Sequence, residues 1–421
     1  MRDDELQVLG RPQEQGNHDR WKTAIIVIAF LSLTTVLGIN IYQIFFSPEP
    51  EKIDSGKKKG EPTIIPDLQK AVDSLLNAQM NVIGNCLQGQ AIVMDVQTGE
   101  ILAMVGQERN YEGKFQSCIN FAYQQELGSL MKTASLLALL EVGVDTGYVV
   151  HTGTGIMPVD GDNEHLMKDH NWHRGGYGDV NLSRALEVSS NIGIGKAVVR
   201  AFGSNQQGFF DMLNKMSFGQ PEQIDGIDGL KPTIYSSPKD SDWVNRRIWW
   251  SAIGYERKIA PIQMLTFYNA IANGGKMVKP TLKTGEIEIL NPQIANKANI
   301  KTMQVVLDHV VSQGLGRKAG TPLLRVAGKT GTSQVGEYEF GEETYVNEYQ
   351  LAFCGYFPAD HSQYSMIVSI NKLGLPASGG GMAGVVFHNI TEWMLCHDMP
   401  TLLIEDEETG NLRKLKETDL Q

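Results

Sequence analysis

The chain has 421 residues, of which 42% are apolar, and a formal net charge of −11 at pH 7. This length leaves room for one large domain or two ordinary ones, and the apolar fraction is enough to fill a sizeable core. The acidic balance argues against a nucleic acid as a partner, because no basic stripe occurs outside the short run Lys57–Lys59.

The N-terminal region predicts a membrane anchor. Residues 1–20 are polar, whereas Thr23–Phe46 carries no charge and is long enough to cross a bilayer as a helix. Basic residues before this run favour a cytoplasmic N-terminus, and no small-x-small cleavage pattern follows it. We therefore expect an uncleaved, single-pass anchor over 21–46. Residues 47–62, rich in Pro, Gly and Lys, are typical of a linker.

Residues 63–397 have the pattern of a folded domain, and a short acidic tail, 398–421, follows it. Apolar residues at helical spacing and turn residues between apolar runs locate its elements. Helices are expected from Pro66, from Ser129, through Ser189 and Asn191, at 261–273, at about 298–313 and from Met382 to His397. A hairpin is expected at Thr98-Gly99, and strands at about 324–335, 349–357 and 363–371. The predicted fold class is α+β, an antiparallel sheet flanked by helices, with a helical subdomain.

Ser129-Leu130-Met131-Lys132 is the first of three short motifs that together indicate acyl transfer. The residues that follow, up to Val142, have helical apolar spacing without Gly or Pro, so Ser129 is expected at the start of a buried helix. Three residues make about one turn, which places Lys132 on the same side as Ser129. A serine hydroxyl needs a base, and burial favours a neutral lysine amine. We expect Ser129 to be the nucleophile, with its amide as an oxyanion donor, and Lys132 to be the base.

Ser189-Ser190-Asn191 is the second motif. A hydroxyl and an amide side chain two residues apart can serve a proton transfer and a substrate peptide group in the same cleft. Ser189 is expected to relay a proton towards a leaving amine. Asn191 is expected to hold a substrate amide.

The third motif is Lys329-Thr330-Gly331-Thr332. Small residues surround the lysine, and they allow a substrate chain to lie close to the backbone. Lys329, Thr330 and Thr332 offer a cation and two hydroxyls to a carboxylate, with Gly331 as the close-approach position. The ligand that these residues predict is a peptide with a free C-terminus.

The three motifs together resemble those of penicillin-binding proteins and serine β-lactamases. Three further segments resemble the transpeptidase domain of the class B penicillin-binding proteins: Asp95–Val105, Pro261–Gly275 and Cys354–Asp360. The resemblance covers about residues 63–397 and implies that family's fold. It also implies that the amide of Thr332 is a second oxyanion donor.

The resemblance implies a peptidoglycan D,D-transpeptidase, an enzyme in which Ser129 forms an acyl-enzyme with a D-Ala-D-Ala stem peptide and an amine of a neighbouring stem takes the acyl group. Such an enzyme binds β-lactams covalently and faces the extracytoplasmic side of the bacterial inner membrane. Two alternatives stay open. In one, water hydrolyses the ester of the acyl-enzyme, as in a D,D-carboxypeptidase or a β-lactamase. The other is a non-catalytic scaffold or β-lactam sensor.

The sequence departs from the class B pattern between the anchor and the catalytic domain. Only about 45 residues separate Phe46 from Ala91, so the large pedestal domain usual in the class has no counterpart there. In the resemblance the pedestal contacts a membrane polymerase of the SEDS type, which makes the glycan strand. The partner expected here is such a polymerase, with the docking surface left open.

No metal and no cofactor is expected. His151, His165, His170 and His173 crowd one stretch, and the last two have a spacing that metal ligands also show. Zinc is the alternative interpretation, but family members have polar loops here without metal. The four cysteines form no Cys-x-x-Cys pair, and we interpret them as packed thiols.

Overall fold

The structure, a computed structural model, describes residues 59–218, 234–235, 237–285, 287–340, 344–397, 403–405 and 412–414. The predicted cytoplasmic segment, the anchor over 21–46 and most of the linker and acidic tail lie outside these residues. Within the described part of the chain, no helix is both long and apolar enough to cross a membrane.

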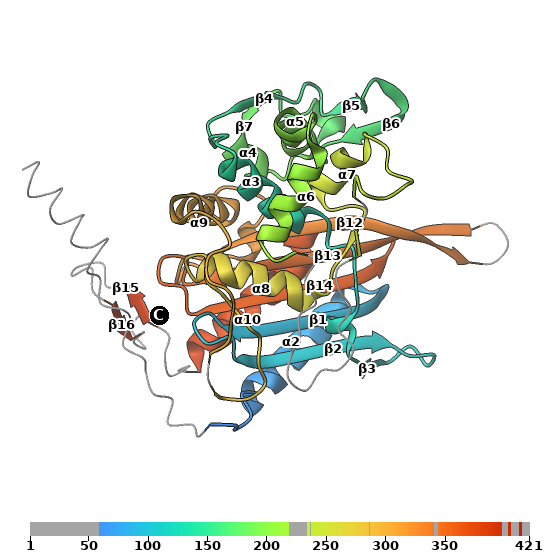
Figure 1. The fold of residues 1–421 in the computed structure, drawn as a ribbon. Helices are drawn as coiled ribbons and strands as arrows, with labels where there is room; N and C mark the ends of the chain where they lie inside the picture. Colours follow the sequence, from blue (N-terminus) through green and yellow to red (C-terminus); the bar gives the residue numbers. More distant parts are fainter. Residues whose placement is uncertain are drawn as a thin grey trace, which may run out of the picture. The chain divides into compact units, whose positions relative to one another are not determined.

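A six-stranded sheet forms the centre of the domain (Figure 1), and every neighbouring pair in it is antiparallel. The order is β12-β13-β14-β1-β2-β3. The strands are β1 (Cys86–Asp95), β2 (Ile101–Arg109), β3 (Phe115–Ser117), β12 (Ala327–Phe340), β13 (Thr344–Phe357) and β14 (Tyr364–Leu373). The predicted hairpin at Thr98-Gly99 joins β1 to β2. The predicted antiparallel sheet is confirmed.

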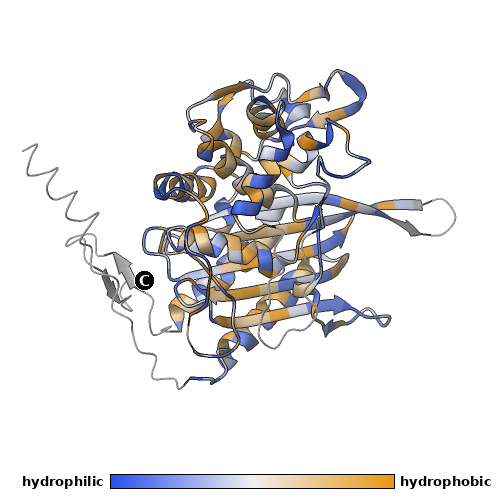
Figure 2. Ribbon diagram, viewed as in Figure 1, coloured by the Kyte–Doolittle hydropathy of each residue, from blue (hydrophilic) through white to orange (hydrophobic). Residues whose placement is uncertain are grey.

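Both faces of the central part of the sheet are buried, because side chains of β1, β2, β13 and β14 alternate between two apolar clusters. Ile92 of β1 pairs with Ile367 of β14 and belongs to the cluster that includes α8 (Pro261–Ala272). Its neighbour Val93 belongs to the cluster on the other face, which includes α2 (Pro66–Ile83) and α10 (Gly384–Cys396). Figure 2 shows the apolar residues gathered along these strands and helices. The arrangement explains why the strands read as continuous apolar runs.

The predicted helices that cover the sheet are confirmed, with bounds within a few residues of those expected. Helix α2 begins with Pro66 in its first turn and buries four residues spaced four apart, Leu68, Val72, Leu76 and Met80. Helix α8 is buried along its whole length. The remaining helix of this group is α9 (Lys297–Ser312), and a π-helical turn, Gly379–Ala383, precedes α10.

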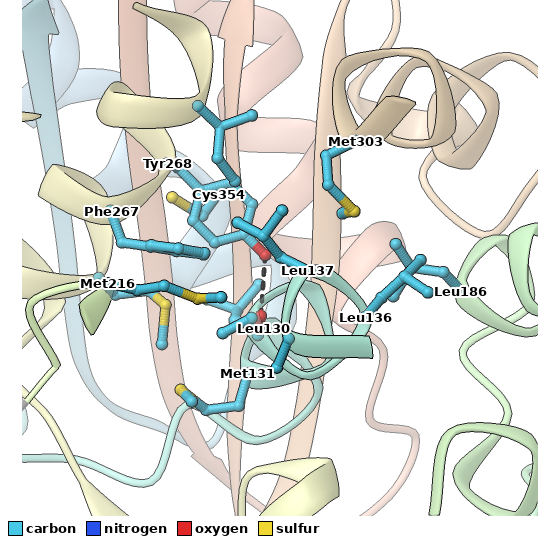
Figure 3. Close-up of a cluster of buried hydrophobic side chains, with 14 of the residues drawn as sticks. Leu130, Met131, Leu136, Leu137, Leu186, Met216, Phe267, Tyr268, Met303 and Cys354 are labelled. Atoms are coloured by element: carbon cyan, nitrogen blue, oxygen red, sulfur yellow. Dashed lines mark hydrogen bonds between the residues drawn. The ribbon is translucent and has the colours of Figure 1, made fainter. Parts of the chain in front are cut away.

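A helical subdomain packs beside the sheet (Figure 1). Its helices are α3 (Met131–Glu141), α4 (Leu182–Glu187), α5 (Asn191–Phe202), α6 (Gln206–Lys215) and α7 (Arg247–Ile253). Residues 131–140 of α3 are all buried, so this helix is enclosed on every side. Figure 3 shows Leu130, just before this helix, and Met131, Leu136 and Leu137 within it, among side chains from α4, α8, α9 and β13.

The short strands pair in twos. They are β4 (Val149–His151) with β7 (Asp179–Asn181), β5 (Ile156–Val159) with β6 (Asp162–Lys168), β8 (Ile234–Tyr235) with β9 (Arg257–Lys258), β10 (Met277–Val278) with β11 (Ile289–Asn291), and β15 (Leu403–Glu405) with β16 (Leu412–Lys414). Single turns of 3-10 helix occur at Asn120–Ala122, Gly128–Leu130, Trp172–Arg174 and Arg317–Ala319. The predicted loop rich in Gly and His therefore contains regular structure.

Two expectations are wrong. The predicted helix through Ser189 is interrupted, because α4 ends at Glu187 and α5 begins at Asn191. Ser189 has a φ of 55°, which a right-handed helix cannot continue through. The four cysteines are free as expected, but Cys396 is exposed rather than packed.

Candidate active site

The turn that carries Ser129 lies against the edge strand β12. Ser129 is in the 3-10 turn Gly128–Leu130, just before α3, and its side chain is partly exposed. Gly128 has a φ of 52°, and a Cβ there would lie 2.9 Å from the Cβ of Ser333. Glycine is needed both for the left-handed backbone and for this close approach. The first motif is thus held against the strand that carries the third.

Lys132 joins the first motif to the second. It is fully buried on the first turn of α3, and its Nζ donates to the carbonyl oxygen of Ser189 at 2.7 Å and to Oδ1 of Asn191 at 2.6 Å. A longer bond, 3.2 Å, reaches Oγ of Ser189. Three residues predicted from two separate motifs therefore meet at one amine.

Burial lowers the pKa of Lys132 from 10.5 to about 7, because an ammonium loses its hydration in the interior. The negative charge of Asp169 acts in the opposite direction and raises it. A lysine with a pKa near 7 is neutral in a large part of the molecules at physiological pH. That amine can accept a proton, which an ordinary lysine cannot.

Lys329 is also fully buried, on β12. Its Nζ donates to the carbonyl oxygen of Thr330 at 3.0 Å and to the hydroxyl of the same residue at 3.3 Å. Burial first, and then the positive charge of Lys132, lower the pKa of Lys329 well below its ordinary value. The close approach of Gly128 to Ser333 likewise places the third motif beside the first.

The remaining residues of the third motif have different surroundings. The side chain of Thr330 is buried, whereas Thr332 is exposed and its hydroxyl accepts a hydrogen bond from the amide of Gly379 at 3.0 Å. A Cβ at Gly331 would lie 2.7 Å from the carbonyl oxygen of Leu127. Only glycine allows the Ser129 turn to approach β12 this closely.

Three of the four histidines have a separate polar neighbour, whereas the ring of His173 lies against that of Trp172. Ring nitrogens of His151 and His165 lie 2.5 Å and 2.8 Å from carboxylate oxygens of Asp179 and Asp162, respectively. His170 is exposed, and its Nε2 lies 3.1 Å from the hydroxyl of Tyr177. Within the part of the chain that the structure describes, no three His, Cys, Asp or Glu side chains are placed to share a metal ion.

Comparison with known proteins identifies the family. Residues 89–392 match the family model described as the penicillin binding protein transpeptidase domain. The chain belongs to this family.

Among relatives of this transpeptidase-domain protein, penicillin-binding protein PbpB of Mycobacterium tuberculosis is 26% identical, over 79% of this chain and 51% of that protein. Peptidoglycan D,D-transpeptidase FtsI of Buchnera aphidicola is 24% identical, over 80% of this chain and 59% of that protein. The chain thus spans little more than half the length of these curated relatives.

Solved structures of the family share the fold. The structure of penicillin-binding protein 3 from Mycobacterium tuberculosis in complex with ampicillin has a TM-score of 0.67 and 23% identity, and the similarity covers 85% of this chain and 82% of that one. The mixed fold of helices and antiparallel sheet predicted from the sequence is therefore confirmed.

One residue of this transpeptidase domain has a place in the site that no motif indicates. Asp169 is fully buried, and its carboxylate accepts hydrogen bonds from the hydroxyl of Ser190 and the backbone amides of Asn191 and Ile192. In the sequence it stands among the histidines, twenty residues before the second motif, and its neighbours Lys168, His170 and Asn171 are also polar, so nothing in its local sequence sets it apart.

Proposed function

We propose that this chain is a peptidoglycan D,D-transpeptidase that acts through a seryl acyl-enzyme. The observation that carries the proposal is the environment of Lys132, a buried amine with a pKa of about 7 that is bonded to Ser189 and Asn191 and lies one helical turn after Ser129. A structural lysine gains nothing from such burial, because desolvation costs stability. A general base requires it.

In the first half of the reaction, Ser129 attacks the carbonyl carbon of the penultimate D-Ala of a stem peptide. The bond between Oγ and that carbon forms, the hydroxyl proton goes to Lys132, and the amide bond to the last D-Ala breaks. Ser189 relays the proton to the leaving amine. A neutral Lys132 has two N–H donors and one lone pair. The two carbonyl oxygens at 2.6 and 2.7 Å occupy the donors, which leaves the lone pair for a hydroxyl proton.

In the second half, an amine of a neighbouring stem attacks the ester. The new C–N bond forms, the C–O bond to Ser129 breaks, and the proton of the amine returns to the serine through Lys132. The amides of Ser129 and Thr332 stabilise the oxyanion in both halves. Asn191 holds a substrate amide throughout.

The carboxylate of the donor stem peptide, or of a β-lactam, is assigned to the third motif. Lys329 supplies the cation, and Thr330 and Thr332 supply hydroxyls, with Gly331 allowing the ligand close to the strand. Among the described residues, the printed partners of the buried Lys329 amine are oxygens of Thr330 and not a carboxylate. This supports the role, because an anion brought to the amine would be strongly attracted. No cofactor or metal enters the reaction.

Covalent labelling tests the nucleophile. Ser129→Ala should abolish labelling by a fluorescent penicillin without changing the melting temperature. Ser204→Ala, a change at an exposed serine of the same subdomain, should label normally. Persistent labelling of the Ser129 variant would refute the assignment.

A product assay separates the transpeptidase from its alternatives. The full chain is incubated with glycan polymer and a matching polymerase, and the stem peptides are then analysed. Cross-linked dimers support a transpeptidase. Free D-Ala without dimers indicates a D,D-carboxypeptidase. In a parallel incubation with a β-lactam, hydrolysed β-lactam indicates a β-lactamase. A stable acyl-enzyme with no product indicates a scaffold or sensor.

The proposal includes a membrane setting. We assign 21–46 as the anchor, through the uncharged run Thr23–Phe46, with residues 1–20 in the cytoplasm and the transpeptidase domain, 63–397, on the extracytoplasmic side. The substrate is on that side, and a SEDS-type polymerase is the partner that would supply it. Reporter fusions after residue 20 and after residue 421 test the topology, since a reporter that works only outside the cytoplasm should be active only at the second site.

A further inference from the structure

The buried carboxylate of Asp169 holds the turn that presents the second motif. It follows β6 and lies beside the first turn of α5. Oδ2 accepts the hydroxyl of Ser190 at 2.8 Å, and Oδ1 accepts the backbone amides of Asn191 at 2.6 Å and Ile192 at 3.1 Å. These amides are among those that a helix start leaves without partners. The carboxylate is therefore fully paired and fixed in place.

The neighbouring residue of the same segment fixes the side chain of Asn191. The carbonyl oxygen of Lys168 accepts Nδ2 of Asn191 at 2.6 Å, which leaves Oδ1 directed at Nζ of Lys132. Lys168 and Asp169 thus hold both the backbone and the side chain of Asn191. The orientation of the amide, and not only its position, is set from this segment.

The turn needs such support because it is strained. Ser189 has a left-handed φ of 55°, an uncommon conformation for a residue with a side chain. This conformation brings its carbonyl oxygen to 2.7 Å from Nζ of Lys132. The bonds that Asp169 accepts from the next three residues hold the chain immediately after the strained position. Backbone bonds from the amides of Ser189 and Ser190 hold the chain before it, so loss of the carboxylate would loosen the turn on the side of α5.

We propose that Asp169 is a positioning residue for acyl transfer: it holds the turn Ser189–Asn191 in the conformation that orients Lys132. The inference rests on the proposed function, since it assigns a role within the same reaction. Asp169 itself touches neither the substrate nor the reacting hydroxyl.

The same carboxylate acts on Lys132 through its charge. Among the described residues, the charged or titratable groups that interact with this amine are Asp169, Lys329 and His170. The negative charge of Asp169 raises the pKa of Lys132 against the effect of burial. Removing that charge therefore lowers the pKa further, and the amine becomes neutral at a lower pH. A residue with a purely structural role would not produce this shift.

The experiment measures the second-order rate constant of acylation by a fluorescent penicillin between pH 5 and 9 in the full-length protein. Asp169→Asn should lower the rate constant at its high-pH plateau roughly ten- to a hundredfold, since the turn loses its fixed geometry. It should also move the midpoint to lower pH. Ser190→Ala removes the hydroxyl that donates to Asp169 and accepts from the amide of Gly193, but it removes no charge. It should lower the plateau of the rate constant less and leave the midpoint unchanged. Asp179→Asn, at an exposed carboxylate of the same subdomain, should match the unmodified protein.

The outcomes separate this inference from the proposed function. If Asp169→Asn keeps both the plateau and the midpoint while Ser129→Ala is inert, the positioning role is wrong and the proposed function stands. If Ser129→Ala is still labelled, the proposed function fails first. If Asp169→Asn does not fold, as judged by its melting temperature, Ser190→Ala decides, and a rate equal to that of the unmodified protein overturns the positioning role.

Discussion

The hydroxyl of Tyr268 on α8 donates a hydrogen bond to the carbonyl oxygen of Leu130 at 2.9 Å, one residue after Ser129 (Figure 3). The same hydroxyl lies 2.7 Å from that of Thr133, which must be the donor there because Tyr268 has only one proton to give. Tyr268 is fully buried. It thus connects the helix that covers the sheet to the turn that carries the proposed nucleophile.

Tyr268→Phe should therefore affect both stability and acylation. Leu130 and Thr133 would lose a buried partner, which costs about 1–3 kcal/mol of unfolding free energy. The Ser129 turn would lose one of its restraints, so acylation should slow several-fold. Denaturant unfolding and penicillin labelling measure the two effects. Tyr111→Phe, at a fully exposed tyrosine, is the matched control and should change neither.

Acylation should rise with pH and level off with a midpoint near 7. Burial lowers the pKa of Lys132 to about 7, so the fraction of neutral base increases through this range. Stopped-flow labelling between pH 5 and 9 measures the profile. Lys132→Arg keeps a positive charge at every pH in this range and should be inactive throughout. A midpoint near 10, or a flat profile, would contradict the assignment of Lys132.

Lys329→Met should weaken the binding of β-lactams before acylation. A charge-assisted hydrogen bond contributes about 1.5–3 kcal/mol, so the dissociation constant should rise by roughly one to two orders of magnitude. Lys372→Met is the matched control, because Lys372 is a buried lysine of the same sheet whose Nζ donates to the backbone carbonyl oxygens of Gly374 and Pro376. Saturation kinetics that are the same for both variants would remove Lys329 from the carboxylate site.

Binding through Lys329 should also weaken as the pH rises. Burial and the charge of Lys132 lower the pKa of Lys329, so the ammonium is lost at a lower pH than for an exposed lysine. The cation that attracts the carboxylate is present below this pKa and absent above it. The dissociation constant measured from saturation should therefore increase with pH, while the acylation step becomes faster.

Gly254→Ala should disturb the Ser129 turn, although the two positions are far apart in the sequence. Gly254 follows α7 with a φ of 98°, and a Cβ there would overlap the carbonyl oxygen of Gly128. Gly143 has a φ of 86°, and a Cβ there would have no neighbour within 4 Å. Gly143→Ala should therefore lower the free energy of unfolding only by the backbone cost of about 1–2 kcal/mol. Gly254→Ala should lower the free energy of unfolding by about 2 kcal/mol more than Gly143→Ala does, because its Cβ also overlaps the carbonyl oxygen of Gly128. Unfolding measures the difference, and labelling should fall only for Gly254→Ala.

Local patterns predicted the elements that carry strong periodicity. Pro66 and the apolar residues after it marked α2, and the turn at Thr98-Gly99 marked the hairpin of β1 and β2. The residues proposed for the site were also predicted, because Ser129, Lys132 and Lys329 stand in short motifs that do not depend on distant contacts. The structure then brings two of these motifs together at one amine.

The features that the sequence did not predict, the turn at Ser189 and the role of Asp169, depend on contacts between distant segments. Apolar spacing on both sides of Ser189 favoured one continuous helix. Lys132 instead donates to the carbonyl oxygen of Ser189, and Ser190 donates to Asp169, and these bonds hold a left-handed turn there. Asp169 has no periodic or motif signal of its own. Its role depends on the amides of α5, twenty residues later, and such pairings become visible only in three dimensions.

The burial of Lys132 also limits when this protein can react. Its contacts come from residues 57 and 59 positions further along the chain, so they form only when the subdomain has assembled. In a nascent or partly unfolded chain the amine is hydrated and returns to an ordinary, protonated lysine. Ser129 then has no base and stays inert towards esters and lactams. On the proposed function, Ser129 gains its base only when folding is complete, and labelling by a β-lactam would report native molecules alone.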